Sequence, residues 1–395
     1  MVDITNIAAV HGAPRHDAAT ARAPVPLTDV SYTAWRSLSE RAIEPNAYYL
    51  PDWELAVNAS APGRTGASAL VATNETSTHM TGLMPVVSLW QAYKIPLPAI
   101  VSAHPYGTLC TPYLDRETAD DAVTRLIRQA RQAGARALLL REVSLDGAAM
   151  RVFDDNLGRE GLRPRVLQSH VRACLDATRD AEALLHDALS GKKLKELRRQ
   201  RQRLAEHGVV RFNVARSPET VASALETFLA LEASGWKGQR GTALIQLAGD
   251  AAFIRRATRA LAGYGQCEIV TLYAGDKPVA AGVVLRHQDR AFFFKLGVDE
   301  RFAKYSPGVQ LTLDLTRHLC ADPAIASADS TASPDHPMIN PIWRGRLAVG
   351  DVLIPLRPND PVVTLIHAAL ASRRLAFETA RSAFRFIRKH RGKSA

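Results

Sequence analysis

The sequence has few cysteines and no long apolar run. Four cysteines occur in 395 residues, and none lies in a CxxC pair. This usage suits a reducing compartment, in which cysteine packs as a small apolar residue. No apolar run approaches the roughly 20 residues that span a bilayer. The N-terminus also lacks the basic stretch and apolar block of a secretory signal, so we expect a cytoplasmic protein.

Several motifs of cofactor and metal chemistry are absent as well. No GxGxxG follows an expected strand, which argues against a dinucleotide-binding unit. The chain contains no HExxH or HxxxH, and its 12 histidines do not cluster at ligand spacing. We therefore predict that no metal takes part in the function.

Positive charge is present in excess and is concentrated in two segments. The formal net charge is +11, of which residues 190–206 contribute +5 and residues 372–395 contribute +7. Such segments could contact cofactor phosphates, an anionic membrane or nucleic acid, or they could be solvated helix faces. Because no nucleic-acid-binding module accompanies them, nucleic acid is a poor candidate partner.

The hydrophobic pattern predicts an α+β protein with a flexible segment over residues 1–27. Three apolar runs joined by short turns at 275–278 and 288–290 predict an antiparallel meander. Around it the pattern predicts helices over 119–132, 147–159, 218–234, 251–261 and 310–319, and strands over 67–73, 83–90, 135–143, 162–175, 324–330 and 348–355.

The last strand of the meander, Ala291–Gly297, leads through a turn into a helix, and this junction is a candidate anion site. The first turn of a helix has unpaired N–H groups and partial positive charge. Pro307 presets its own φ, Gly308 permits close approach of the backbone, and Arg301 and Lys304 add charge nearby. Many such junctions bind nothing, so the pattern alone leaves both interpretations open.

Longer stretches carry a family resemblance. "FLALEASGWKGQRGTAL", "FFFKLGVDERFAKYSPGVQL" and "DSTASPDHPMINPIWRGR" resemble the GNAT acyl-CoA N-acyltransferases, in particular the CelD/BcsL-type acetyltransferases of bacterial polysaccharide and cellulose loci. In the first half, "PNAYYLPDWELA", "TGLMPVVSL" and "ALLLREV" are similar to the N-terminal region of that family. The tandem arrangement also resembles the Fem-type aminoacyltransferases.

The resemblance implies two GNAT-like units with mixed, mostly antiparallel sheets flanked by helices. They would be a degenerate unit over residues 28–180 and a catalytic unit over 181–356, followed by a basic amphipathic helix over 357–395. It also implies acetyl-CoA or another acyl-CoA as donor. The usual phosphate signature, R/Q-x-x-G-x-G/A, is reduced here to a turn with one glycine and a proline. The implied donor-binding residues are Arg301, Lys304, Tyr305, Ser306, Gly308, Val309 and Gln310.

Direct acyl transfer to an amine needs a base, an oxyanion donor and an acid for the thiolate. Asp329 ends an expected strand and His336 follows in a polar loop, so the two could act as orienter and base. Alternatively, Asp329 caps the loop and His336 is exposed. Tyr305 could donate a proton to the thiolate or stack on the turn.

The acceptor is expected beside a glycine-rich loop. Glu232, Trp236 and Lys237 stand at a helix end next to three glycines, which suits a mobile lid or a buried aromatic anchor. Trp343 could line the same site or pack in the core. Lys295, inside an apolar strand, could face the cofactor or solvent.

The C-terminal segment predicts one long helix with an apolar face. Ile366, Leu370, Phe377, Phe384 and Ile387 recur at helical spacing, and the arginines largely avoid that face. The helix could lie peripherally on an anionic membrane, or dock on the protein's own surface or a second subunit.

Three functions remain open at this stage. The first is transfer of an acyl group from CoA to an amine, such as an amino sugar or an envelope precursor. The second is a Fem-like transfer from aminoacyl-tRNA, which would give residues 190–206 an RNA-facing role. The third is a non-catalytic binding protein that keeps the fold.

Overall fold

The computed structural model describes residues 24–74 and 79–391, with side chains up to residue 379 and not beyond. Most of the predicted flexible segment lies outside these residues. Its last part is structured, because strand β1 (Val25–Pro26) pairs with β2 (Ser68–Thr73) and Leu27 is fully buried.

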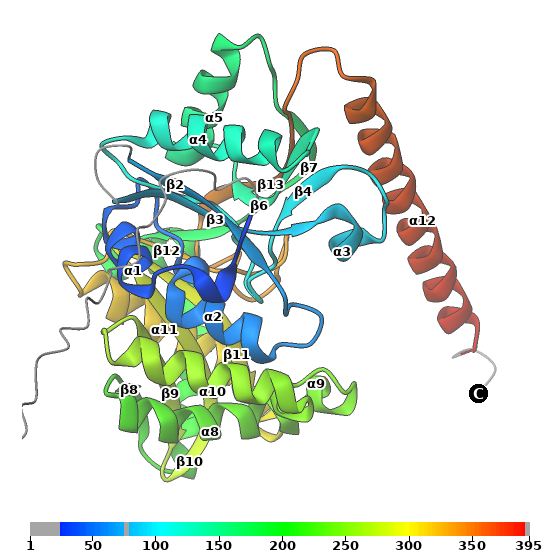
Figure 1. The fold of residues 1–395 in the computed structure, drawn as a ribbon. Coiled ribbons are helices and arrows are strands. Elements are labelled where there is room, and N and C mark those ends of the chain that lie inside the picture. The colour runs from blue at the N-terminus through cyan, green and yellow to red at the C-terminus, as the bar shows by residue number, and fades with distance from the viewer. Residues whose placement is uncertain (1–23, 75–78, 392–395) are drawn as a thin grey trace, which may run out of the picture.

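The strands form one mixed sheet, with the order β1-β2-β3-β4-β6-β13-β7-β12-β11-β10-β9-β8 and with β5 (Tyr113–Leu114) beside β3 (Figure 1). The first half of the chain supplies one unit of this sheet. Its elements in order are α1 (Tyr32–Arg41), α2 (Pro51–Ser60), β2, β3 (Met80–Ser88), α3 (Leu89–Tyr93), β4 (Ala99–Ser102), α4 (Ala119–Gln132), β6 (Ala137–Ser144), α5 (Ala148–Arg159) and β7 (Arg165–Asp176).

The second half repeats this plan after two connecting helices, α6 (Ala181–Ala188) and α7 (Gly191–Leu204). Each unit begins with a strand and two main helices, which are followed by three antiparallel strands and a further helix. The next strand pairs in parallel with the third of the three antiparallel strands, and a last antiparallel strand ends the unit. The second unit consists of β8 (Val210–Ala215), α8 (Pro218–Ser234), α9 (Trp236–Gln239), α10 (Ala248–Ala262), β9 (Cys267–Ala274), β10 (Lys277–His287), β11 (Arg290–Val298), η5 (Glu300–Tyr305), α11 (Pro307–Cys320), β12 (Ser327–Asp329) and β13 (Gly345–Pro355).

The two units exchange their last strands. β7, from the first unit, pairs with β12 of the second, and β13, from the second unit, pairs with β6 of the first. β7 and β13 also pair with each other, with Cys174 opposite Gly345. The predicted boundary between residues 180 and 181 therefore separates the two units along the chain. The sheet is continuous across both units, because each contributes its last strand to the other.

Local sequence explains where the helices begin. The Ser217 side chain accepts a hydrogen bond from Thr220 N, and Pro218 takes the first helical position of α8. Ser190 caps α7 in the same way, and after a 3-10 turn Gly208 ends that stretch with a φ of +124°. Helices α2, α8 and α10 pack on one face of β9–β11, and α11 packs on the other.

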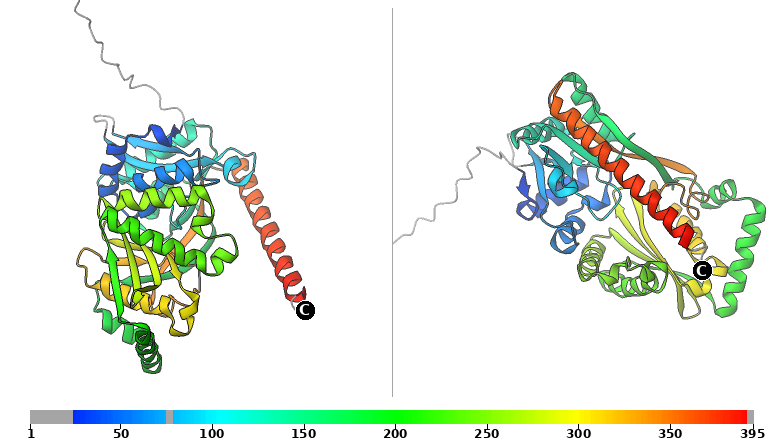
Figure 2. Two further views of the ribbon diagram at one scale, coloured as in Figure 1. Left: turned by 90° about the horizontal axis from the view of Figure 1, so that it is seen from below. Right: turned by 90° about the vertical axis from the view of Figure 1, so that its right-hand side faces the viewer.

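The C-terminal helix α12 (Pro361–Arg391) forms as predicted and extends from the body of the molecule (Figure 2). Val363 and Ile366 in its first turns are buried against β6 and β13. Leu375 and Phe377, further along, are 65% and 60% exposed. In the part of the chain that the structure describes, no helix is long and apolar enough to cross a membrane.

Candidate active site

The turn between β11 and α11 is built from a short 3-10 helix and one left-handed residue. The Asp299 side chain accepts from Arg301 N at the start of η5, and Ser306 has a φ of +54° at the start of α11. Pro307 occupies the first helical position, as the sequence predicts. Because Ser306 makes no side-chain cap, the first turn of α11 presents N–H groups at a corner where Ser306 and Val309 are half-buried.

The predicted donor-binding residues divide into exposed and buried groups. Arg301 and Lys304 are exposed, although Arg301 already pairs with Asp299 at 2.8 Å. Tyr305 is buried and its hydroxyl lies 2.9 Å from His207 Nε2. Gln310 is also buried and donates to Leu197 O on α7. The accessible part of the turn is therefore smaller than the motif implied.

Gly308 serves packing within the protein. A Cβ atom there would lie 3.1 Å from Leu296 Cδ2, 3.2 Å from Val298 Cγ1 and 3.3 Å from Met338 Sδ. The glycine thus lets α11 approach β11 and the segment that contains Met338, between β12 and β13. Gly308 is therefore required by the protein's own packing, and its role toward a donor stays a prediction.

The basic helix α7 lies beside this corner. Its apolar residues Leu197 and Leu204 are buried in the same core as Tyr305, and Arg201 pairs with Asp314 of α11 at 2.8 Å. The rest of its charge faces solvent, on Lys192, Lys193, Lys195, Arg198, Arg199 and Arg203. One of the two basic segments of the sequence is therefore a charged surface next to the turn.

Strands β11 and β12 part beyond their first three residues. They pair in parallel from Arg290 opposite Ser327 to Phe292 opposite Asp329. Just past this point β11 has a bulge, because Val283 pairs with Lys295 and Val284 with Phe293, which leaves Phe294 without a partner residue on β10. Thr331, after β12, donates from its hydroxyl to Phe293 O at 2.6 Å. The sheet is thus open where β11 and β12 diverge.

Asp329 lies at this opening, but it does not meet His336. It is 1% exposed, and its Oδ1 accepts from Arg172 Nε at 2.8 Å and from Thr331 N at 2.8 Å. His336 lies in the following loop, where its Nδ1 accepts from Met338 N and burial lowers its pKa. The predicted pair is not formed because Arg172, from β7 of the first unit, holds the carboxylate.

Residues of the first unit complete the surroundings of Asp329. Arg172 also donates to Thr108 O at 2.7 Å. The hydroxyls of Tyr48 and Thr108 are buried near each other and near Thr331, but neither forms a hydrogen bond of good geometry among the described residues. A buried polar atom without a partner is unusual and marks a place where a ligand or water can bind. No motif or spacing in the sequence predicted that Tyr48, Thr108 and Arg172 would lie together.

Glu232 forms the centre of a charged cluster on the α8 side of β11. Its carboxylate is fully buried and lies 2.9 Å from Lys237 Nζ and 3.6 Å from Lys295 Nζ, and it accepts from Leu244 N. Burial opposes the charge of Glu232, but Lys295 and Lys237 outweigh it and lower its pKa. Burial also lowers the pKa of Lys295, which lies over the ring of Tyr106. Glu232 and Lys237 thus form an ion pair, and their predicted role toward an acceptor stays a prediction.

The two predicted tryptophans have opposite environments. Trp236 is 52% exposed, stacks with Arg240, and donates from its backbone N to Glu300 Oε1, which ties the glycine-rich loop to the α11 turn. Trp343 is fully buried in the core, where its Nε1 donates to Thr316 Oγ1 at 2.9 Å. Of the two roles weighed for Trp343, the structure shows core packing.

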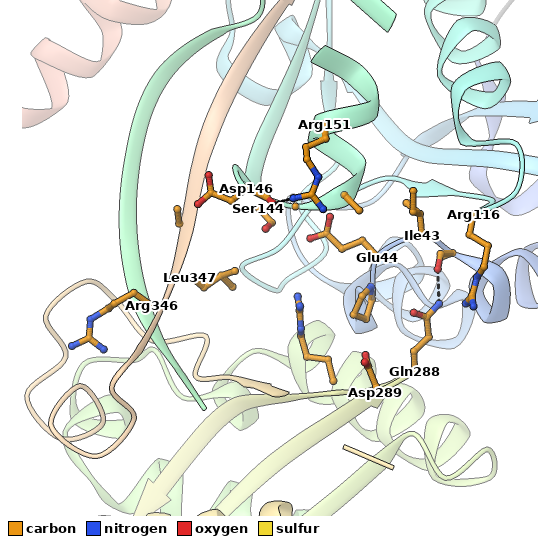
Figure 3. A pocket seen from close by; sticks show the side chains of 16 residues that line it. Ile43, Glu44, Arg116, Ser144, Asp146, Arg151, Gln288, Asp289, Arg346 and Leu347 are labelled. Atoms are coloured by element: carbon orange, nitrogen blue, oxygen red, sulfur yellow. Dashed lines mark hydrogen bonds between the residues drawn. The ribbon is translucent and has the colours of Figure 1, made fainter. Parts of the chain in front are cut away.

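A cavity of about 710 Å³ lies at the opposite end of β11 from the turn (Figure 3). The side chains of Glu44 and Arg151 point toward one another in it. Glu44 accepts from Ala149 N at the start of α5, and burial raises its pKa while Arg290 and Arg151 act in the opposite sense. This cavity lies at the junction of the units, because residues of both units line it. Its buried carboxylate already accepts a hydrogen bond from the first turn of α5. No group of three or more histidine, cysteine or acidic residues suited to a metal occurs among the described residues.

Comparison with known proteins places these features in a family. Residues 191–335 match the model of a family described as "Acetyltransferase (GNAT) domain". The matched range runs from α7 to the loop after β12 and contains the bulged strand and the α11 turn. Over these residues the chain is therefore similar to a GNAT acetyltransferase domain. No curated protein matches the sequence significantly.

Solved structures share the fold over most of the chain. FemX has 11% identity and a TM-score of 0.57, covering 86% of this chain and 98% of FemX. The C-terminal domain of a putative lysylphosphatidylglycerol synthetase from Agrobacterium fabrum has 15% identity and a TM-score of 0.52, covering 86% and 96%. A conserved protein of unknown function from Bacteroides thetaiotaomicron has 11% identity and a TM-score of 0.51, covering 83% and 98%. The predicted α+β fold with tandem GNAT-like units is confirmed.

Proposed function

We propose that the protein transfers an acyl group from an acyl-CoA directly to the amine of an acceptor, without a covalent enzyme intermediate. The donor's phosphates would lie at the Ser306–Val309 corner, and its thioester would enter the opening between β11 and β12. The CelD/BcsL-type resemblance favours an amino sugar or an envelope precursor as acceptor. In this proposal Arg301 and Lys304 would contact the donor's phosphates, and Tyr305 would lie beside them.

One observation carries this proposal: the matched domain contains a parallel strand pair that parts beside a bulge. A thioester that lies in this opening has its carbonyl near the backbone of Phe294, which has no partner on β10. Backbone N–H groups at such a place can stabilise the oxyanion of the transition state. The exposed charges of α7 lie beside the adjoining turn and suit the phosphates of a CoA molecule.

The same charged surface favours a second candidate, which is transfer from an aminoacyl-tRNA. The chain shares its fold with FemX over 86% of its length, and α7 presents six exposed basic residues. Phosphate contacts of RNA and of CoA draw on the same side chains. The two candidates are therefore distinguished by whether an acyl-CoA or an aminoacyl-tRNA stabilises the folded protein.

Thermal unfolding with added ligand separates these candidates. Acetyl-CoA, a longer acyl-CoA and free CoA should each raise Tm, because a ligand that binds only the folded state stabilises it by about 2.7 kcal/mol at a concentration of 100 Kd. Acetyl-pantetheine, which lacks the phosphates, should give a much smaller shift. If only charged tRNA raises Tm, the second candidate holds, and if none of these ligands does, both fail.

A charge-reversal pair tests the assigned corner. Arg301→Glu with Lys304→Glu should weaken the acetyl-CoA shift, whereas Arg128→Glu with Arg163→Glu makes the same change of charge at exposed positions elsewhere. Equal effects of the two pairs would show a non-specific charge effect and would contradict the assignment. We avoid substitution of Gly308 for this test, because its surroundings are core side chains.

A further inference from the structure

A cavity of about 420 Å³ lies between α12 and the strands of the first unit. Its walls include Tyr93 after β3, Arg141 and Glu142 on β6, Asp351 on β13, and Arg373 on α12. Arg374 fastens the helix over it by donating to Leu167 O of β7 at 2.9 Å. In Figure 2, right, α12 runs across the front of these strands. The volume is within the range of small-molecule sites.

Two guanidinium groups in this cavity form no ion pair within the part of the chain that the structure describes, although the Asp351 and Glu142 carboxylates are near Arg141. Arg141 is half-buried and lies 5.5 Å from the ring centre of Tyr93, and Arg373 lies 4.9 Å from the same ring. Among the described residues, neither forms a hydrogen bond or an ion pair through its guanidinium. The neighbouring Asp351 is already engaged, because its oxygens accept from Glu142 N at 2.9 Å and from Gln168 Nε2 at 2.7 Å. Two half-buried arginines that approach the same ring from β6 and α12 favour a phosphate ligand between them.

Glu142 is held in a strained conformation beside them. Its φ is +45°, although it lies within strand β6 and is not a glycine. Its backbone groups leave the ladder, since N–H donates to Asp351 and C=O accepts from Cys110 N at 3.1 Å. Such strain costs about 1–3 kcal/mol and collects at functional sites. Burial, and then Asp351, raises the pKa of its carboxyl group.

The carboxylate of Glu142 lies close to a histidine of β7. It lies 3.9 Å from His170 Nε2 on β7. Arg172, two residues further along β7, holds Asp329 at the end of β12. The cavity is thus connected through β7 to the place where β11 and β12 part.

We propose that this cavity is the acceptor subsite and that it takes a primary amine carrying a phosphate group, with Arg141 and Arg373 binding the phosphate and Glu142 binding the ammonium. This inference rests on the proposed acyl transfer. Glu142 would accept one proton from the ammonium. The amine nitrogen would then form the C–N bond while the thioester C–S bond breaks, and the thiolate would take the second proton from nitrogen.

Matched acceptors test the phosphate preference on the full-length protein with acetyl-CoA, measured as released thiol. Ethanolamine is compared with O-phosphoethanolamine, and glucosamine with glucosamine 6-phosphate. We expect kcat/KM to be higher for the phosphorylated member of each pair by about tenfold or more. Phosphatidylethanolamine in vesicles forms a further arm, which distinguishes a lipid headgroup from a free phosphate; use of either source supports the inference.

Variants locate the preference. Arg373→Met removes one of the two guanidinium groups that line the cavity and should lower the phosphorylated-to-unphosphorylated ratio to about one. Arg141→Met should do the same, and Arg128→Met on α4 should leave the ratio unchanged. An unchanged ratio in Arg373→Met, or equal use of both members of each pair by the parent protein, would overturn the inference.

Binding without donor separates this inference from the proposed function. Calorimetry with O-phosphoethanolamine alone should show binding that Arg373→Met removes. If acetyl-CoA binds but O-phosphoethanolamine and phosphatidylethanolamine vesicles do not, the acceptor inference fails and the acyl-CoA proposal stands. If O-phosphoethanolamine binds through Arg373 and acetyl-CoA does not, the ligand chemistry of the cavity is supported and the donor assignment fails.

Discussion

Arg172 and Asp329 form a two-point ion pair that joins β7 of the first unit to β12 of the second. Nε lies 2.8 Å from Oδ1, the second nitrogen pairs with Oδ2, and the two side chains are 0% and 1% exposed. The pair stands at the point where the units exchange strands. The contact therefore joins the exchanged strands at the place where β11 and β12 part.

Removal of either partner of this pair should destabilise the whole chain. Arg172→Met leaves a buried carboxylate without its partner, which we expect to lower the free energy of unfolding by about 3–5 kcal/mol. Urea denaturation measures this change. The double variant Arg172→Met/Asp329→Leu should lose less than the sum of the two single variants, because no uncompensated charge remains. A loss under about 1 kcal/mol in Arg172→Met would contradict the structural role.

A second contact between the units should make stability depend on pH. His287 Nδ1 accepts from Asn46 N and Nε2 lies 2.9 Å from Ser39 O, and burial lowers the pKa of this histidine to about 4. The unfolded chain, with a histidine pKa near 6.5, binds the proton first as pH falls. The stabilisation is therefore complete above pH ~6.5 and is lost between pH ~6.5 and ~4.

The variant His287→Gln isolates this effect. Between pH 7.5 and 5 the parent should lose about 2 kcal/mol of unfolding free energy that the variant does not lose. Arg36 lowers the pKa of His287 as well. Half-buried His104, whose own pKa is lowered to about 3, adds a similar slope in both proteins. Equal pH slopes for parent and variant would show that His287 does not titrate on unfolding.

Strain at Glu142 should separate stability from activity. Glu142→Gly removes the cost of a positive φ, so the unfolding free energy should not fall, whereas acyl transfer should decrease by about 100-fold or more if the carboxylate is the base. Glu142→Gln keeps the strain and should lose the same activity. The acid limb of the parent's kcat/KM profile should disappear in Glu142→Gln. In the parent, Asp351 raises the pKa of Glu142, whereas His170, Arg172 and Arg141 act to lower it. A variant with normal rate would exclude Glu142 as base.

Periodicity predicted the local structure of this chain well. Helix α4 has the predicted bounds Ala119–Gln132, and the meander, the turn at Pro307 and the helix after it all form. These features depend on neighbours within a few residues, such as a capping side chain or an apolar stripe. The expected strand over 324–330 is reduced to Ser327–Asp329, because only these residues reach both β7 and β11.

The site depends on contacts between residues far apart in the sequence. Asp329 and His336 are close in sequence, yet the partner of Asp329 is Arg172, 157 residues earlier. A pattern of residues in one half cannot show which strand of the other half will lie beside it. Glu232 and Lys237 were found because they share one helix end. Tyr48 and Thr108 were missed because only the packing of the first unit brings them to the second.

The outer part of α12 should bind anionic membranes. Leu375 and Phe377 are 65% and 60% exposed, and Arg373 lies over the ring of Phe377 at 4.4 Å. Two apolar side chains among arginines can enter the interface of a bilayer while the charges meet lipid phosphates. Leu375→Ser with Phe377→Ser should weaken binding to phosphatidylglycerol vesicles by about tenfold or more, as the burial of two such side chains implies.

Sedimentation with vesicles measures this binding. Phosphatidylcholine vesicles should retain much less protein than phosphatidylglycerol vesicles, and raised salt should release it, because the charge term is screened. Val209→Ser removes an exposed apolar side chain at another position and should have no effect. If the double variant binds like the parent, the exposed face of α12 serves another contact. Acetyl-CoA binding should be the same in all three proteins, since α12 lies outside the matched domain.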